Sequence, residues 1–221
     1  MRRIDDTSEP LWLEWARQLQ AIAQIGLHYT QDPFDKERYT QLQTLAIAIY
    51  EHHPIATDTP LSEVVQADYG YMTPKIDTRA IVLNAHGELL MVRENLDGGR
   101  WSIPGGWADV NSSPSQNVER EVLEESGFVV RATRLLAVLD RRLHPYPPNV
   151  FSIYKLFFLC QLLSDTPTVS PQGTLESSEW RFFAPHALPD ETEFSSGRIQ
   201  RAQLLDLLAR ANDPTLPTLF D

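Results

Sequence analysis

The chain has 221 residues, 42% of them hydrophobic, which suffices for one large domain or two small ones. Its formal net charge of −11 argues against general binding to nucleic acid by phosphate neutralisation. A nucleotide substrate stays open, because a divalent cation can supply positive charge locally. The single cysteine, Cys160, excludes an intrachain disulfide, and its apolar setting favours an inert thiol. With no signal-peptide core and no apolar run of about 20 residues, we expect a cytoplasmic protein that does not enter a membrane.

Residues 1–66 are expected to form a small helical domain. Ser8 can cap a first helix, with Pro10 in its first turn. Its predicted apolar face consists of Trp12, Trp15, Leu19, Ile22 and Gly26. A second helix should follow Pro33 and end at His52-His53-Pro54, with an apolar side of Tyr39, Leu42, Leu45, Ala46 and Ile49. Thr59-Pro60 opens a short third helix that reaches Val65.

Such a thin helical layer cannot bury all of these large side chains by itself. It must dock on the rest of the chain or on a second copy of it. Closed two-fold dimers are the commonest oligomers. We therefore expect a homodimer to which these helices contribute.

From about residue 72 the pattern changes to strands. Residues 78–83 and 89–93 flank a His86-Gly87 turn and predict a hairpin. Further β-rich runs cover residues 135–143, 150–162 and 180–183, and residues 197–211 predict a closing helix. We assign residues 67–221 to this second domain.

Between the hairpin and the later strands lies the most informative segment, Gly106 to Phe128. Glu121, Glu124 and Glu125 are three and four residues apart, so on a helix they share one face. Clustered carboxylates repel one another unless a positive charge lies among them, and hard oxygen donors suit Mg²⁺ or Mn²⁺. Arg120 offers a rigid guanidinium fork that can orient a carboxylate. The alternative is a solvated acidic helix face.

Together these residues resemble the Nudix box, G-x5-E-x7-R-E-U-x-E-E-x-G-U, where U is aliphatic or aromatic. Gly106 matches the first glycine, and the remaining matches are Arg120, Glu121, Val122, Glu124, Glu125, Gly127 and Phe128. The resemblance implies an α/β/α sandwich with a mixed sheet, preceded here by a small all-α domain. It also implies a metal-dependent pyrophosphohydrolase that cleaves a nucleoside diphosphate linked to a group X.

Family roles carried over residue by residue make Glu121, Glu124 and Glu125 the metal ligands, with a backbone carbonyl at Gly105 or Gly106. Mg²⁺ is the expected ion, and Mn²⁺ the alternative. Arg120 would orient the carboxylates. The general base would be a box glutamate or one on a later loop, where Glu176 is preferred to Glu179.

One box position departs from the pattern, because Ser112 stands where the family has its early glutamate. That change puts the number of bound ions in doubt, and Asp109 in the same loop is a weak substitute. We do not interpret Ser112 as a sign of inactivation.

The resemblance narrows to a Nudix subgroup with a helical N-terminal domain. It rests on residues 71–80 and 101–110, and on Leu139-Asp140-Arg141 followed by His144-Pro145. Members of that subgroup are ADP-ribose or CDP-choline pyrophosphatases. Candidate contacts to phosphates or sugar hydroxyls are Asp77, Arg79, Arg93, Arg141 and Arg142.

Aromatic residues could stack on a base or hold a choline group. The candidates are Tyr71, Trp101, Trp107, Tyr146 and Tyr154, and core packing is the alternative for each, favoured for Tyr154.

A non-catalytic nucleotide-binding regulator with the Nudix fold is the second hypothesis for the whole chain. It is disfavoured because the three helical carboxylates are kept. A third hypothesis, a partner-recruiting or nucleic-acid-binding helical module, conflicts with the acidic balance.

Overall fold

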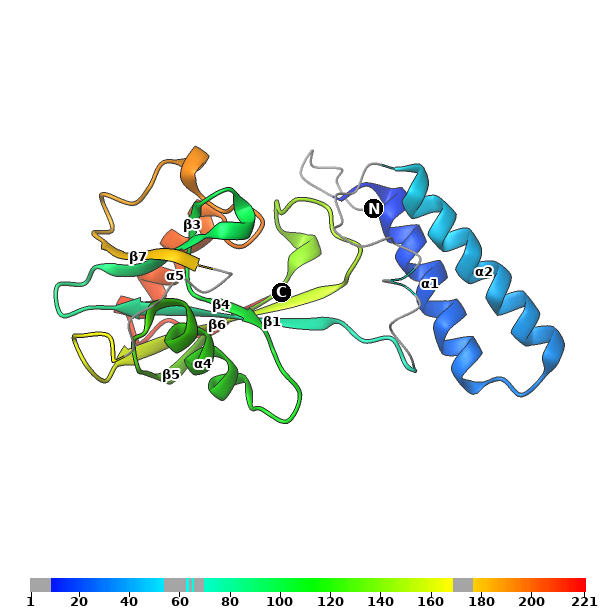
Figure 1. The fold of residues 1–221 in the computed structure, drawn as a ribbon, viewed down its shortest axis with the longest axis horizontal. Helices are drawn as coiled ribbons and strands as arrows, with labels where there is room; N and C mark the ends of the chain where they lie inside the picture. Colours follow the sequence, from blue (N-terminus) through cyan, green and yellow to red (C-terminus); the bar gives the residue numbers. More distant parts are fainter. Residues whose placement is uncertain (1–8, 54–62, 64, 66–69, 169–176) are drawn as a thin grey trace. The chain divides into compact units, whose positions relative to one another are not determined.

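The computed structural model describes residues 9–53, 63, 65, 70–168 and 177–221 (Figure 1). The chain divides into two compact units. One comprises residues 1–74 together with 147–152, and the other comprises residues 75–146 together with 153–221.

The first unit contains two long helices, α1 (Leu11–Tyr29) and α2 (Pro33–His52). The α2 helix begins where Asp32 accepts hydrogen bonds from the backbone N–H groups of Phe34 and Asp35, at 2.8 and 3.0 Å. Both helices were predicted with close bounds, although Pro10 is the N-cap of α1 and does not lie within its first turn. Ser8 lies outside the described residues, and of the predicted third helix only Glu63 and Val65 are described, both helical.

The α1 helix buries its predicted apolar face only in part, since Trp12 stacks on His53 and Gly26 lies against Tyr39. Trp15 and Ile22 are 56% and 54% exposed, whereas Ala16, Gln20 and Ala23 are buried. Small alanines let two helices approach closely, and the buried Gln20 accepts a hydrogen bond from the Tyr50 hydroxyl at 2.9 Å. Trp15 and Ile22 are therefore left exposed.

The second unit contains a mixed sheet. Its described strands are β1 (Lys75–Leu83), β2 (Leu89–Glu94), β3 (Arg100–Ser102), β4 (Gly105–Trp107), β5 (Val130–Asp140), β6 (Ile153–Leu162), β7 (Ser177–Phe183) and β8 (Leu219–Phe220). The main order is β3-β2-β1-β6-β5-β8, while β4 pairs with β1 and β7 pairs with β2. The β1–β6 and β5–β8 pairs are parallel, and the other pairs are antiparallel.

The predicted hairpin is present but short. Its turn is held by the Asn84 side chain, which accepts hydrogen bonds from the N–H groups of His86 and Glu88, and Gly87 adopts a φ of 73°. The strands pair at Leu83 and Leu89. Beyond that point β1 pairs with β4 and β2 with β7, so the hairpin opens and admits β4 beside β1. The bend at Pro104 and the first two residues of β4, Gly105 and Gly106, together form the glycine turn.

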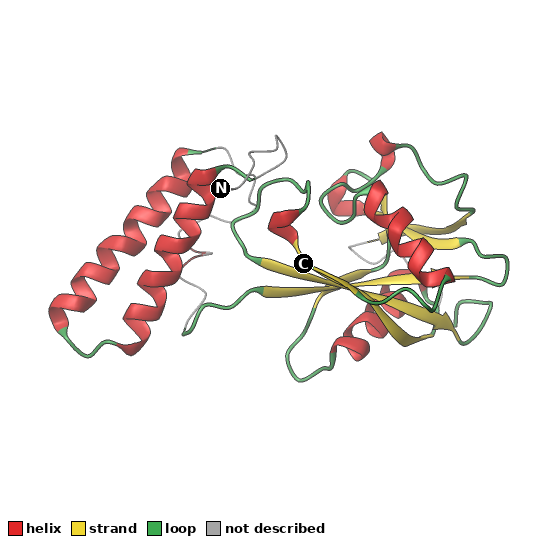
Figure 2. Cartoon of the chain, turned by 180° about the vertical axis from the view of Figure 1, so that it is seen from behind, coloured by secondary structure: helices red, strands yellow, loops and turns green. Residues whose placement is uncertain are grey.

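Two helices cover the sheet, α4 (Pro114–Ser126) on one face and α5 (Arg201–Asn212) on the other (Figures 1 and 2). Val118 and Val122 of α4 pack in a cluster with Ala80 and Phe158, whereas Leu204 and Leu208 of α5 join a cluster with Ile81 and Phe157. The alternation of neighbouring strand residues between the clusters confirms the predicted α/β/α sandwich. The closing helix begins at Arg201, four residues later than predicted, and residues 141–143 form a 3₁₀ turn where strand was expected.

Candidate active site

The acidic motif lies on α4, whose two ends are fixed by its own sequence. Ser113 caps the helix by accepting from the N–H of Gln116, and the Gln116 side chain accepts from the N–H of Ser113 in return. Gly127 ends the helix with a φ of 76°, a conformation that favours glycine. Glu121 and Glu125 are buried, and Glu124 is exposed.

The glycine turn brings backbone directly against these carboxylates. The Gly105 N–H donates to the Glu125 carboxylate at 2.9 Å. A Cβ on Gly106 would come 2.8 Å from the nearer carboxylate oxygen of Glu121. The absence of a side chain at position 106 therefore allows Glu121 to lie beside the strand β4 backbone.

Arg120 contacts the acidic side chains that it was expected to orient. Its guanidinium donates to Glu121 at 2.9 Å and to Glu124 at 2.6 Å, and it lies 3.0 Å from Asp109. The Arg120 guanidinium thus contacts three carboxylates, two on α4 and one on the loop before it.

Burial changes the acidity of the two inner carboxyl groups. Burial raises the pKa of Glu125 to about 8, the positive charge of Arg79 opposes that rise, and the negative charge of Glu94 adds to it. Burial also raises the pKa of Glu121, against the opposing effect of Arg120. A divalent cation beside these groups would favour their ionised forms.

Behind the glycine turn lies a network of buried charges. The Arg79 Nε donates to Asp77 at 2.9 Å, and the Arg79 guanidinium lies 3.8 Å from Glu94. Asp77 also pairs with Lys155. Burial raises the pKa of Asp77, but Arg79 and Lys155 outweigh that effect and lower it. Burial lowers the pKa of Lys155 to about 8.

This network contains most of the predicted substrate contacts. Asp77, Arg79 and Arg141 are buried, and the Arg141 guanidinium lies 5.2 Å from the centre of the Tyr146 ring. Arg142, in contrast, is exposed and pairs with Asp140 at 2.5 Å. The contact of these three buried residues with substrate stays a prediction.

Arg93 lies on the exposed side of β2. It donates to the Gly99 carbonyl at 2.7 Å and to Glu179 at 3.3 Å, and Glu179 also accepts from Arg181 at 2.9 Å. Glu179 is therefore paired with two arginines, Arg93 and Arg181. Glu176, the preferred base, lies outside the described residues.

The aromatic candidates separate by exposure. Trp107, next to the glycine turn, is 49% exposed, while Trp101 and Tyr146 are buried. Tyr154 is 39% exposed, so the expectation that it packs in the core was wrong. It alternates on β6 with the buried Lys155, which takes the inward position. Tyr71 is exposed in the other unit.

The loop that carries Ser112 is held by Asn117. The buried Asn117 amide donates to the carbonyls of Asp109, Ser112 and Ser113 at 3.2–3.4 Å, and its oxygen accepts from the Asp109 N–H at 2.8 Å. Ser112 itself is exposed. The loop is therefore ordered without a glutamate at that position.

Three residues of this arrangement were missed in the sequence: Glu94, Asn117 and Lys155. Glu94 contacts Arg79 and Arg198, so it links β1 to the segment before α5. A lysine within the apolar run 153–160 is a signal that could have been noticed, since buried lysines require a partner. Nothing local in the sequence distinguishes Glu94 or Asn117.

The donor chemistry fits a hard divalent cation, because two buried carboxylates, those of Glu121 and Glu125, lie against the backbone of Gly105 and Gly106. Within the described residues, however, no three acidic, histidine or cysteine side chains are arranged around a single metal position. Glu124 is turned toward Arg120 and Glu125 toward the Gly105 N–H. The exposed Glu124 side chain has room to turn from Arg120 when an ion binds.

Comparison with known families matches two regions. A model described as the NUDIX domain matches residues 73–205, and one described as a UDP-X-like, N-terminal oligomerisation domain matches residues 10–66. The chain therefore belongs to the Nudix family, and it is a Nudix hydrolase. Hydrolases of this family generally use divalent metal ions.

Relatives cover most of the chain. "Putative ADP-ribose pyrophosphatase YjhB" of Bacillus subtilis (strain 168) is 34% identical over 95% of this chain and 97% of its own. A crystal structure titled UDP-X diphosphatase has a TM-score of 0.57 at 29% identity, covering 95% of this chain and 98% of the other. An ADP-ribose pyrophosphatase structure from Streptococcus suis has a TM-score of 0.55 at 34% identity, over 67% and 100% of the two chains.

No helix among the described residues is both long enough and apolar enough to cross a membrane.

Proposed function

We propose that this Nudix hydrolase cleaves the pyrophosphate of a nucleoside diphosphate linked to X, with ADP-ribose as the first candidate. The products would be a nucleoside monophosphate and phosphorylated X. The observation that best supports this proposal is that Arg120 donates hydrogen bonds to both Glu121 and Glu124 beside the glycine turn. The ADP-ribose assignment is supported by the name of the B. subtilis relative, and the UDP-X structure makes uridine substrates the second arm.

The chain's own residues explain how a doubly negative pyrophosphate could be accepted. Glu121, Glu124 and Glu125, with the Gly105 carbonyl, would hold Mg²⁺ or Mn²⁺. A bound divalent ion neutralises phosphate oxygens and lowers the pKa of a coordinated water. Arg120 would keep Glu121 and Glu124 in place as the ion enters. Arg79, on the far side of Gly105, would limit the repulsion among the buried carboxylates.

The proposal also includes a general base and the residues that contact the substrate. Glu176 stays our preferred general base. The alternative is Glu179, which lies within strand β7 and not on a loop as expected, and accepts a hydrogen bond from Arg93. Arg93 and Trp107 are the exposed candidates for phosphate and base contact. The buried residues Asp77, Arg79 and Arg141 stay candidates for contact with phosphates or sugar hydroxyls.

A phosphate-release panel tests this function. ADP-ribose, CDP-choline, CDP-ethanolamine, UDP-sugars, NADH and dinucleoside polyphosphates would be incubated with the full chain and Mg²⁺. Alkaline phosphatase would then release phosphate only from products that carry a terminal phosphate. We expect ADP-ribose to give the highest kcat/KM and EDTA to abolish the signal. Tight nucleotide binding with no hydrolysis of any compound would instead support the non-catalytic regulator.

We also propose that the protein is a homodimer assembled through residues 1–66. The match of residues 10–66 to an N-terminal oligomerisation domain supports this, as does the exposed apolar face of α1. A chain lacking residues 1–66 should be monomeric or aggregate. A deletion variant that stays dimeric and fully active would show that the helices serve another purpose.

A further inference from the structure

The outer face of α1 carries a regular seam. Its positions are 11, 15, 18, 22, 25 and 29, separated alternately by four and three residues. Four large apolar side chains of the seam are more than half exposed: Leu11 at 62%, Trp15 at 56%, Ile22 at 54% and Tyr29 at 64%. Alternating spacing of this kind marks the contact positions of one helix packed along another.

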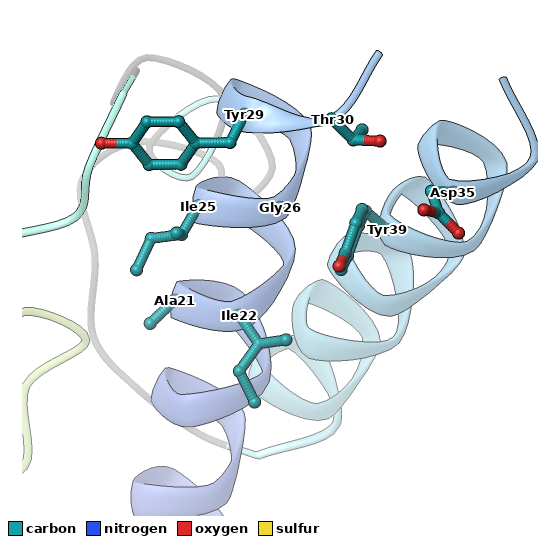
Figure 3. A pocket seen from close by; sticks show the side chains of 8 residues that line it. All are labelled: Ala21, Ile22, Ile25, Gly26, Tyr29, Thr30, Asp35 and Tyr39. Carbon is teal, nitrogen blue, oxygen red and sulfur yellow. The ribbon is translucent and has the colours of Figure 1, made fainter. Parts of the chain in front are cut away.

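A groove of about 550 Å³ opens at one end of this seam (Figure 3). Its α1 wall includes Ile22, Ile25, Gly26 and Tyr29, which are related as i, i+3, i+4 and i+7. Four residues with that relation surround a single hole into which a side chain of a facing helix can insert. The α1 residues therefore form a receptor site for a large side chain.

Gly26 allows the Tyr39 ring of α2 to approach α1 at the groove. A Cβ at Gly26 would overlap the ring of Tyr39, which lies flat against the α1 backbone there. Tyr39 and Asp35 of α2 complete the lining. The glycine thus lets α2 approach α1 and makes the Tyr39 ring one wall of the groove.

We infer that α1 of a second copy packs antiparallel along this seam, with the partner's Trp15 entering the groove at Ile25 and Gly26. This inference rests on the proposed homodimer and names its surface. The seam is symmetric about position 20, so a two-fold axis there pairs 11 with 29, 15 with 25, and 18 with 22. Each copy then offers a bulky end to the grooved end of the other, as a self-complementary interface requires.

A parallel two-fold pairing fits the same surface poorly. It would place each seam residue against its own copy, so Trp15 would meet Trp15 and the two grooves would face each other unfilled. The antiparallel pairing fills both grooves with the large side chains that are otherwise exposed to water. The side chains that fill each groove therefore come from the same seam of the second copy.

The first test measures mass in solution with the full chain. Sedimentation of the wild type should give twice the 25.2 kDa of one chain. Ile22→Glu places a charge twice in a symmetric apolar contact, and should weaken dimerisation by at least about 100-fold. Leu163→Glu, at an equally exposed apolar residue of the other unit, should stay dimeric. Circular dichroism and the rate of hydrolysis per chain should be unchanged in both variants.

The second test fixes the orientation by cross-linking. Positions 11 and 29 are about 27 Å apart along one helix at 1.5 Å per residue. Mixed Leu11→Cys and Tyr29→Cys chains should form a disulfide-linked dimer, whereas neither variant should do so alone. The native Cys160 is buried and gives a quiet background, since burial raises the pKa of its thiol to about 12.

The outcomes separate the two proposals. A monomeric wild type would sink the homodimer itself. A dimeric wild type with a dimeric Ile22→Glu variant would overturn only the seam as its surface. Cross-linking of Leu11→Cys with itself would overturn the antiparallel arrangement.

Discussion

Replacing Gly105 by alanine should destabilise the second unit, residues 75–146 and 153–221, more than replacing other glycines of that unit. Gly105 has a φ of 144°, and a Cβ there would overlap the Thr78 carbonyl oxygen and lie 2.8 Å from the Arg79 Cα. Both obstacles are backbone atoms of β1, which also pairs with β6. Backbone strain of order 1–3 kcal/mol and overpacking of about 1–3 kcal/mol give a loss of roughly 2–6 kcal/mol.

That loss is a large part of the ~5–15 kcal/mol that stabilises most domains. Urea unfolding followed by circular dichroism would measure it, with two glycine controls. Gly87→Ala has a positive φ but open space, so it should lose only about 1–2 kcal/mol. Gly197→Ala has open space and no positive φ, so it should be neutral or slightly stabilising. A Gly105→Ala variant as stable as Gly197→Ala would refute the reasoning.

Three further predictions concern the same unit. Gly106→Ala should keep the fold but lower the hydrolysis rate, because its Cβ displaces the Glu121 carboxylate and not backbone; an unchanged rate would contradict that placement. Ser112→Glu should change rate or metal affinity only modestly, since Asn117 already orders the loop, whereas activation of an inert wild type would indicate a degenerate binder. Between pH 8 and 10.5 the folded chain loses the proton of Lys155, whereas the unfolded chain keeps it. The free energy of unfolding should therefore rise with pH by up to about 3 kcal/mol, measured relative to Lys155→Met. Parallel curves of this free energy against pH for the two proteins would contradict the prediction.

Local sequence signals were sufficient for the catalytic helix. The spacing of the three glutamates and the glycine at position 127 lie within one short segment, and the structure contains that helix; its Ser113 cap was not predicted. The same holds for α2 and for the hairpin turn, where Pro33 and Gly87 mark the boundaries. These features depend on neighbours in the chain, so periodicity and turn residues are enough to locate them.

Features that depend on distant partners were not predictable in this way. The choice between two faces of α1 depends on Gln20 meeting Tyr50, thirty residues away. Lys155 is buried because Asp77 lies beside it on the parallel strand β1, and Tyr154 is consequently turned outward. The burial of Asp77 and Arg79 likewise follows from the insertion of β4 beside β1, which no local pattern announces.

Hydrolysis of ADP-ribose by the wild type and by Glu125→Gln, each with and without Mg²⁺, tests the central claim most directly. Glutamine keeps the size of the Glu125 side chain but removes the negative charge that the carboxylate would carry beside a bound ion. We predict Mg²⁺-dependent formation of AMP by the wild type, abolished by EDTA. The Glu125→Gln rate should be at least about 100-fold lower, as for loss of a major electrostatic contributor. Equal rates for the two proteins, or full wild-type activity in EDTA, would contradict the assignment of the α4 carboxylates as the metal site of this hydrolase.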